Sequence, residues 1–180
     1  MTGWSAVVLA GGSGTRLGGV DKAAIEIGGR TLLDRLVGVL DDAERIVVVG
    51  PERAVRGDVT WAREDPPGGG PLAGVAAGLA HVETRHVVLL AVDQPGTTSA
   101  TITRLLDRIG VDGALLVDAD GRAQWLTSAW RAKALRAALP ADPAGRSLRS
   151  VLGALDAVLV PAEPGESDDV DTPADLARFT

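Results

Sequence analysis

Apolar residues along the chain occur in two kinds of segment that alternate from the N-terminus onward. Short runs rich in Val and bounded by Gly, Pro or charge, such as residues 5–10, are typical of strands buried on both faces. Other segments, such as residues 31–40, repeat their apolar positions with the period of an α-helix. This pattern predicts strands at residues 5–10, 45–49, 59–62, 86–92, 113–117, 124–130 and 157–160, and helices at residues 31–40, 71–82, 99–109, 131–139, 146–155 and 172–179.

Local signals place some element ends. Residues 24–29 alternate and finish in two glycines, which predicts a small hairpin, and Ser99 is the expected N-cap of its helix. The regular alternation of strands and helices predicts an α/β layered protein with helices on both faces of a mostly parallel sheet. Because neither an internal repeat nor a low-complexity linker interrupts the pattern, we expect one domain over residues 1–180.

Composition narrows the classes of function. The net charge of -6 argues against general binding to nucleic acid or to an anionic membrane, because both require a basic face. The chain has no cysteine, which excludes disulfides and thiolate chemistry and is compatible with the cytoplasm, our expected location. We see neither a signal-peptide pattern nor an apolar run long enough to span a membrane. The cations are sixteen Arg and only two Lys, Lys22 and Lys133.

One of these two lysines closes a glycine-rich segment. Residues 9–22, LAGGSGTRLGGVDK, leave the first predicted strand and contain five glycines. The dinucleotide fingerprint fails because Leu17 stands where its last glycine should be, and the Walker pattern fails because Ala23 follows Lys22. Two interpretations remain about equally supported. The segment is either a bare connection with solvated cations, or a loop whose amides, with Arg16 and Lys22, hold an anion.

Three further segments carry candidate chemistry, each with a structural alternative. Asp93 follows a buried strand, where open α/β sheets bind ligands, but an Asp there also caps turns. Residues 68–74 place glycines before a helix N-terminus, which suits either anion binding or close helix packing. Residues 168–173 hold three carboxylates, which form a solvated cap or share a cation. Mg²⁺ is commonly held by one or two carboxylates plus substrate phosphates.

In this order, the segments resemble the molybdenum cofactor guanylyltransferase family, within the wider nucleotidyltransferase superfamily. The resemblance covers nearly the whole chain. It implies a three-layer α/β/α sandwich with a Rossmann-like, mostly parallel sheet that includes one antiparallel strand. The residues that carry it are Leu9-Ala10-Gly11-Gly12, Arg16-Leu17-Gly18, Asp21-Lys22, Gly70-Pro71-Leu72-Ala73-Gly74, Asp93-x-Pro95 and Asp171-Thr172-Pro173-x-Asp175-Leu176.

The resemblance implies transfer of GMP from GTP to molybdenum-loaded molybdopterin, with release of pyrophosphate and with Mg²⁺ as cofactor. It also leaves room for transient contact with molybdenum-cofactor insertion proteins or apoenzymes. Arg16, Lys22 and Asp93 would be catalytic. Asp93 and Asp171 would hold the metal. Asp169 is the alternative to Asp171 as the second metal or nucleotide contact. The nucleotide-binding residues would be Leu9, Ala10, Gly11, Gly12, Lys22, Asp65, Gly70, Pro71, Leu72 and Asp93.

The sequence departs from the family at several positions. Gly50 and Asp171 stand where the family often has Asn, and Gln124-Trp125 stands where a Gln-Pro pair is common. These departures bear on one nucleotide contact, on the metal segment and on the pterin side of the site, respectively. Three alternatives stay open: a cytidylyltransferase for the same cofactor, a guanylyltransferase for another small phosphate such as phospholactate, and a nucleotide-binding protein without catalysis.

Overall fold

A computed structural model describes residues 3–11 and 20–179. Within them, seven strands form one sheet in the order β5-β4-β1-β6-β8-β7-β9, and a separate two-stranded hairpin, β2-β3, lies outside it. The sheet strands are β1 (Trp4–Leu9), β4 (Arg45–Val49), β5 (Thr60–Ala62), β6 (His86–Ala91), β7 (Gly113–Val117), β8 (Ala123–Arg131) and β9 (Ala157–Pro161).

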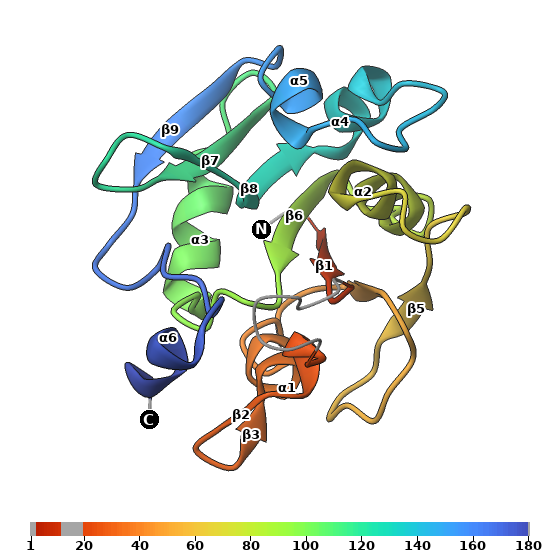
Figure 1. The fold of residues 1–180 in the computed structure, drawn as a ribbon. Coiled ribbons are helices and arrows are strands. Elements are labelled where there is room, and N and C mark those ends of the chain that lie inside the picture. Colours follow the sequence, from red (N-terminus) through yellow and green to blue (C-terminus); the bar gives the residue numbers. More distant parts are fainter. Residues whose placement is uncertain (1–2, 12–19, 180) are drawn as a thin grey trace.

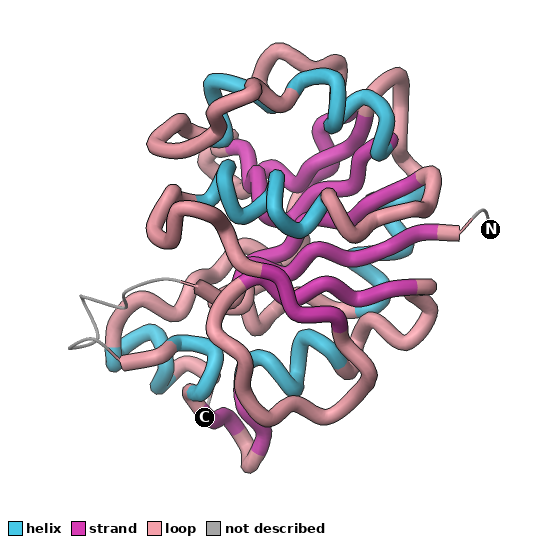
Figure 2. Tube along the Cα trace, turned by 90° about the vertical axis from the view of Figure 1, so that its right-hand side faces the viewer, coloured by secondary structure: helices cyan, strands magenta, loops and turns pink. Residues whose placement is uncertain are grey.

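The sheet is mostly parallel, as expected. β1 pairs in parallel with both of its neighbours, and its central Val7 lies opposite Val47 of β4 and Leu89 of β6. Only β8 runs antiparallel, to β6 on one side and to β7 on the other. Figure 2 shows the long strands lying side by side through the middle of the molecule. The predicted Rossmann-like sheet with one antiparallel strand is therefore confirmed.

Two helical layers cover the sheet. Alternate strand residues point to opposite faces, so Val8, Val48 and Val88 pack on one side while Val7 and Val47 pack on the other. Figure 1 shows the corresponding grouping of the helices. The first layer contains α1 (Leu32–Val37), α3 (Ser99–Asp107) and α6 (Pro173–Ala177), and the second contains α2 (Pro71–Leu79), α4 (Ala132–Ala138) and α5 (Leu148–Leu152).

One local prediction was wrong in detail, and another is confirmed. Thr98, not Ser99, caps α3, because Thr98 and Thr101 exchange side-chain and backbone hydrogen bonds in a capping box. The predicted hairpin is confirmed: it consists of β2 (Glu26–Ile27) and β3 (Arg30–Thr31), and the two glycines between them form its turn with positive φ. A short 3₁₀ helix, η2 (Lys22–Ala24), precedes it. Among the described residues we find no helix with the length and apolar character to cross a membrane.

Candidate functional site

Three charged side chains from distant parts of the chain meet at one edge of the sheet. The Nζ of Lys22 donates to Oδ2 of Asp93 at 2.7 Å and to Oδ1 of Asp171 at 2.5 Å. The Lys22 side chain is 18% exposed, Asp93 26% and Asp171 37%. The sequence placed each residue in a separate segment, and the fold brings them together around a single ammonium group.

Lys22 is held in place by the start of η2. The side chain of Asp21 accepts a hydrogen bond from the backbone N–H of Ala23, which caps this short helix, while Ala23 itself is buried. Arg53, from the loop after β4, forms an ion pair with the same Asp21 carboxylate. The backbone of Lys22 therefore belongs to a segment that is held to the core by Ala23 and to the loop after β4 by Arg53.

Asp93 follows β6 and is fixed through its backbone. Val92 N–H donates to the carbonyl of Leu9 at 3.1 Å, which extends the β1–β6 ladder beyond the strand end. Val170 N–H donates to the carbonyl of Asp93 at 2.8 Å, and Val170 is fully buried. Asp93 thus lies between the end of β1 and the C-terminal acidic segment.

Asp171 precedes α6, whose cap orders the segment. The Oδ2 atom of Asp175 accepts hydrogen bonds from the N–H of Asp171 at 3.2 Å, and from the N–H and hydroxyl of Thr172, each at 2.8 Å. The Thr172 hydroxyl in turn accepts from the N–H of Asp175. The structural interpretation of this segment as a helix cap is therefore correct, and it leaves the Asp171 carboxylate directed to Lys22.

Burial and neighbouring charges shift the pKa of two groups in the site, Lys22 and Asp169. Burial alone would lower the pKa of Lys22, but hydrogen bonds and charge from Asp171 and Asp93 outweigh it, so its pKa is raised and Lys22 stays protonated. The pKa of Asp169 is also raised, first by burial and then by the negative charge of Asp93. Three acids, Asp93, Asp169 and Asp171, therefore act on one another and on the Lys22 ammonium group at this edge of the sheet.

The donor chemistry of this cluster fits Mg²⁺. Within residues 3–11 and 20–179, no group of three or more His, Asp or Glu side chains could hold a metal ion alone. Two carboxylates, Asp93 and Asp171, nevertheless converge on one cationic group. Mg²⁺ takes oxygen ligands and commonly combines one or two carboxylates with substrate phosphates. The residues present suit a metal that arrives with a nucleotide.

Ala10 and Gly11, which follow β1, pass close to the end of β4. Ala10 N–H donates to Val49 O at 2.9 Å, and Gly50 N–H donates to Ala62 O at 3.0 Å. Gly50 has φ +150°, and a Cβ there would lie 3.0 Å from both Ala10 C and Gly11 N. Gly50 is therefore required by the backbone approach to Ala10 and Gly11. The expected contacts of Gly12 and Arg16 lie outside the described residues.

The second glycine segment combines its two interpretations. Gly70 occupies the N-cap of α2 with φ +88° and without a side-chain cap, and Pro71 follows as the first helical residue. Leu72 is fully buried, so only its backbone can face a ligand. Gly74 and Gly78 pack tightly, since Cβ atoms there would lie 3.1 Å from Leu9 Cδ2 and 2.4 Å from Val7 Cγ1. These two glycines serve close helix packing, while Gly70 opens the helix end.

Asp65 lies at some remove from the lysine cluster. It is exposed on the loop after β5, a strand separated from β1 by β4. Its neighbour Glu64 accepts a hydrogen bond from Gly68 N–H at 3.2 Å, which ties the loop to the glycines before α2. Asp65 therefore belongs to the β4–β5–α2 side of the sheet edge, together with Gly70, rather than to the acids around Lys22.

Sequence reasoning missed a chain of polar side chains on the other side of Asp93. Gln94 is buried, accepts from the Thr127 hydroxyl and donates to Gln124 Oε1 at 3.3 Å. Gln124 then donates to Asp118 Oδ2 at 3.1 Å. The chain crosses the ends of β6, β8 and β7. The signal in the sequence was a Gln placed directly after Asp93 and a Thr inside an apolar strand.

The fold and the charged cluster define an α/β protein of the nucleotidyltransferase class. The model of the MobA-like NTP transferase domain matches residues 6–158, which is most of the chain. The chain therefore belongs to the MobA-like NTP transferase family and is a nucleotidyltransferase.

Relatives with assigned names agree with this membership. A probable molybdenum cofactor guanylyltransferase from Natronomonas pharaonis is 30% identical over 194 residues, covering 96% of this chain and 94% of that protein. A molybdenum cofactor guanylyltransferase from Vibrio campbellii is 30% identical over 124 residues, which cover 67% of this chain and 63% of that one. The second match leaves over a third of the Vibrio protein outside the aligned region.

Solved structures share the fold. The molybdopterin-guanine dinucleotide biosynthesis protein A from Archaeoglobus fulgidus superposes with a TM-score of 0.76 at 22% identity, covering 97% of this chain and 96% of that one. A nucleotidyl transferase from Methanothermobacter thermautotroptrophicus gives a TM-score of 0.77 at 24% identity, covering 97% and 94%. At this level of identity the likeness supports the architecture alone.

Proposed function

We propose that this protein transfers GMP from GTP to molybdenum-loaded molybdopterin, forming a guanine dinucleotide cofactor and releasing pyrophosphate. The observation that carries the proposal is the meeting of Lys22 with Asp93 and Asp171 at the carboxyl edge of the sheet, in a member of this family. The names of the relatives from Natronomonas pharaonis and Vibrio campbellii support the choice of guanine nucleotide and acceptor.

The reaction needs no nucleophile from the protein. A terminal phosphate oxygen of the acceptor attacks the α-phosphorus of GTP, a new P–O bond forms, and the bond to the bridging oxygen of the β-phosphate breaks. Pyrophosphate leaves with the electron pair. The protein has to align the two phosphates and stabilise the charge that develops on the leaving group. This agrees with a site built from Lys, Asp and loop amides in a chain without cysteine.

Lys22 is the residue that we expect to contact the phosphates. In the structure its ammonium group neutralises two carboxylates. When these carboxylates take up a metal ion, Lys22 would exchange them for phosphate oxygens. We infer that Asp93 and Asp171 hold Mg²⁺, which supplies charge neutralisation on the triphosphate when bound. Arg16, which precedes Lys22 in the same glycine-rich segment, would add a second cation.

The nucleoside is expected on the β1–β4–α2 side of the edge. The backbone of Leu9, Ala10, Gly11 and Gly12 and the open start of α2 at Gly70, Pro71 and Leu72 would line it. Asp65 would accept hydrogen bonds from N1 and N2 of guanine. Adenine offers no such pair of donors, and an unpaired polar group costs about 1–3 kcal/mol. The acceptor would then lie beyond Asp93, toward Gln94 and Gln124.

The proposal is tested by turnover with each of the four nucleoside triphosphates, Mg²⁺ and the molybdenum-loaded acceptor, with pyrophosphate release as the readout. We expect release with GTP and a strong preference over ATP and CTP. Asp65→Asn should reduce the preference of GTP over ATP by about 10-fold or more. Preferred use of CTP would identify a cytidylyltransferase. Turnover only with phospholactate would identify a different acceptor. Binding of GTP without turnover on molybdenum-loaded molybdopterin or on phospholactate would identify a nucleotide-binding protein without catalysis.

A further inference from the structure

Residues 168–171, the C-terminal acidic segment, reach the site from the edge of the sheet formed by β9. β9 is one of the two edge strands, and β7 and β8 separate it from β6, so three inter-strand steps of about 4.8 Å lie between β9 and β6. The chain after β9 crosses this distance of roughly 14 Å without regular secondary structure before it reaches Val170. Something besides the Val170–Asp93 hydrogen bond has to fix the path of this loop.

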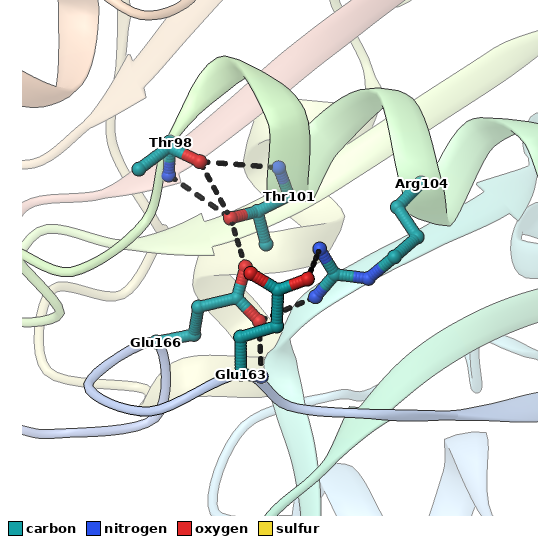
Figure 3. A network of polar contacts seen from close by, with 5 residues as sticks. All are labelled: Thr98, Thr101, Arg104, Glu163 and Glu166. Atoms are coloured by element: carbon teal, nitrogen blue, oxygen red, sulfur yellow. Dashed lines mark hydrogen bonds and ion pairs between the residues drawn. The ribbon is translucent and has the colours of Figure 1, made fainter.

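Glu166, in the middle of the crossing, is an unusual residue for a loop. It is 5% exposed, yet its carboxylate accepts hydrogen bonds from three groups. Oε1 accepts from the hydroxyl of Thr101 at 2.5 Å. Oε2 accepts from the N–H of Glu163 at 2.7 Å and from the guanidinium of Arg104. Figure 3 shows these side chains converging between the loop and the first turns of α3.

The partners of Glu166 are themselves fixed to rigid structure. Thr101 is buried and belongs to the capping box of α3, where its hydroxyl also accepts from Thr98 N–H. Arg104 lies one turn further along α3. Burial alone would raise the pKa of Glu166, but the bonds from Thr101, Glu163 and Arg104 outweigh it, so the carboxyl is charged at neutral pH.

Backbone packing adds a second fixed point beside Glu166. A Cβ on Gly96 would lie 1.9 Å from the carbonyl oxygen of Gly165, so the segment after Asp93 and the crossing loop touch backbone to backbone. The loop is thereby tied to α3 at Glu166, to the Asp93 segment at Gly165, and to Asp93 itself at Val170. Asp169 and Asp171 flank this last contact.

We propose that Glu166 is a positioning residue for the site: its buried carboxylate fastens the crossing loop to α3 and thereby holds Asp171 against Lys22. The inference concerns the placement of the loop, and its catalytic consequence rests on the proposed function. Loss of Glu166 frees the middle of the crossing and widens the range of positions of Asp171. Asp93, which follows β6, and Lys22, which belongs to η2, keep their positions.

The chain offers a matched control. Glu163 lies 3.4 Å from the same Arg104, but its side chain is 70% exposed. Glu163→Gln removes one carboxylate from this network without freeing the loop, because the exposed pair contributes little. Glu166→Ala removes the buried one, and Glu166→Gln retains an oxygen that can still accept from Thr101 or Glu163.

The first measurement is hydrogen exchange of backbone amides in the intact protein. In Glu166→Ala we expect the amides of residues 168–172 to exchange about 10-fold faster or more, while those of β1 and α2 stay within about twofold of wild type. Glu163→Gln should match wild type, and Glu166→Gln should fall between. If exchange at residues 168–172 is unchanged in Glu166→Ala, the proposal is wrong. If this variant does not fold, Arg104→Met provides the test, with about threefold faster exchange expected and no change overturning the proposal.

The second measurement is guanylyl transfer over a range of Mg²⁺ concentrations. Glu166→Ala should raise the Mg²⁺ concentration for half-maximal rate by about 10-fold and lower kcat, with KM for GTP changed less than about threefold, because the nucleoside side is untouched. Equal Mg²⁺ curves despite faster loop exchange would overturn the positioning role. Absence of transfer by the wild type would instead reject the proposed function, while the exchange experiment would still decide how the loop is held.

Discussion

The Nζ of Lys22 lies 2.5 Å from Oδ1 of Asp171, although 149 positions separate the two residues in the sequence. The same nitrogen lies 2.7 Å from Asp93. One ammonium group therefore links the segment after the first glycine loop, the end of β6 and the start of α6. Removing any one of these three charges changes the ion pairs that the other two can form. Single substitutions can therefore separate what Lys22, Asp93 and Asp171 each contribute.

Lys22→Ala should leave the protein folded and reduce transfer sharply. The loss of a charge-assisted phosphate contact in a partly buried site costs on the order of 2–4 kcal/mol of transition-state stabilisation, or about 30- to 1,000-fold in kcat/KM. Lys133, the only other lysine, is exposed on α4, so Lys133→Ala is the matched control and should be unchanged. Wild-type turnover by a folded Lys22→Ala protein would remove this residue from the mechanism.

Asp93→Asn and Asp171→Asn should differ in their Mg²⁺ titrations. Asp93 is the less exposed carboxylate and follows a central strand, so its loss should raise the half-maximal Mg²⁺ concentration and lower the maximal rate. Asp171 is the more exposed of the two, at 37%, so solvent screens its charge better, and Asp171→Asn should have a smaller effect. If Asp93→Asn follows the wild-type curve while Asp171→Asn is inactive, the metal binds nearer to the C-terminal segment.

Gly50→Ala should destabilise the protein and disturb the nucleotide loop. The new Cβ would meet the backbone of Ala10 and Gly11 at 3.0 Å, at a φ of +150° that other residues avoid. We expect a loss of about 1–3 kcal/mol, or roughly 2–12 °C in Tm, together with weaker GTP binding.

A glycine in open space provides the control for that experiment. Gly121 has φ +78° but no atom within 4 Å of an added Cβ, so Gly121→Ala tests backbone strain without the clash. Its Tm should fall by less, and GTP binding should not change. Equal losses in the two variants would show that the close approach to Ala10 and Gly11 has no special importance.

The strands of the sheet could be predicted from the sequence because each is marked by a short local run of apolar residues. Runs such as Val47-Val48-Val49 and Val87-Val88-Leu89 are buried on both faces, and this pattern requires no knowledge of their neighbours. Helix ends were less accurate. The helix expected at 71–82 ends at Leu79, and the next residues continue in tighter turns, with His81 N–H bonded to Gly78 O. The apolar pattern persists through such turns, so periodicity cannot place the end.

The candidate site was predictable only in part. Asp93 could be placed because the ends of parallel strands share one edge, whereas the contact between Lys22 and Asp171 depends on a loop with no period. Glu166 was missed for the same reason. Its partner Thr101 is 65 positions away, and nothing in a loop sequence distinguishes a buried Glu from a solvated one. Long-range polar contacts of this kind require the fold.

The stability contributed by Glu166 should depend on pH in a defined direction. Burial opposes its charge, but Thr101, the N–H of Glu163 and Arg104 bind the carboxylate and hold its pKa below the ordinary 4.5. Above pH 4.5 the charge is present in the folded and unfolded chains, and the folded contacts contribute fully. As the pH falls, the unfolded chain takes up a proton first, and the contribution is lost as the pH passes through the folded pKa.

Glu166→Gln should therefore lower the free energy of unfolding by about 1–3 kcal/mol at pH 7 and by progressively less below about pH 4.5. Thermal unfolding of the two proteins across this pH range measures the difference directly. Glu163→Gln, which affects the exposed partner of Arg104, should show almost no difference at any pH. A gap between wild type and Glu166→Gln that widens toward acid pH would mean that the folded protein prefers a protonated Glu166. The contacts with Thr101 and Arg104 would then not hold it as a carboxylate.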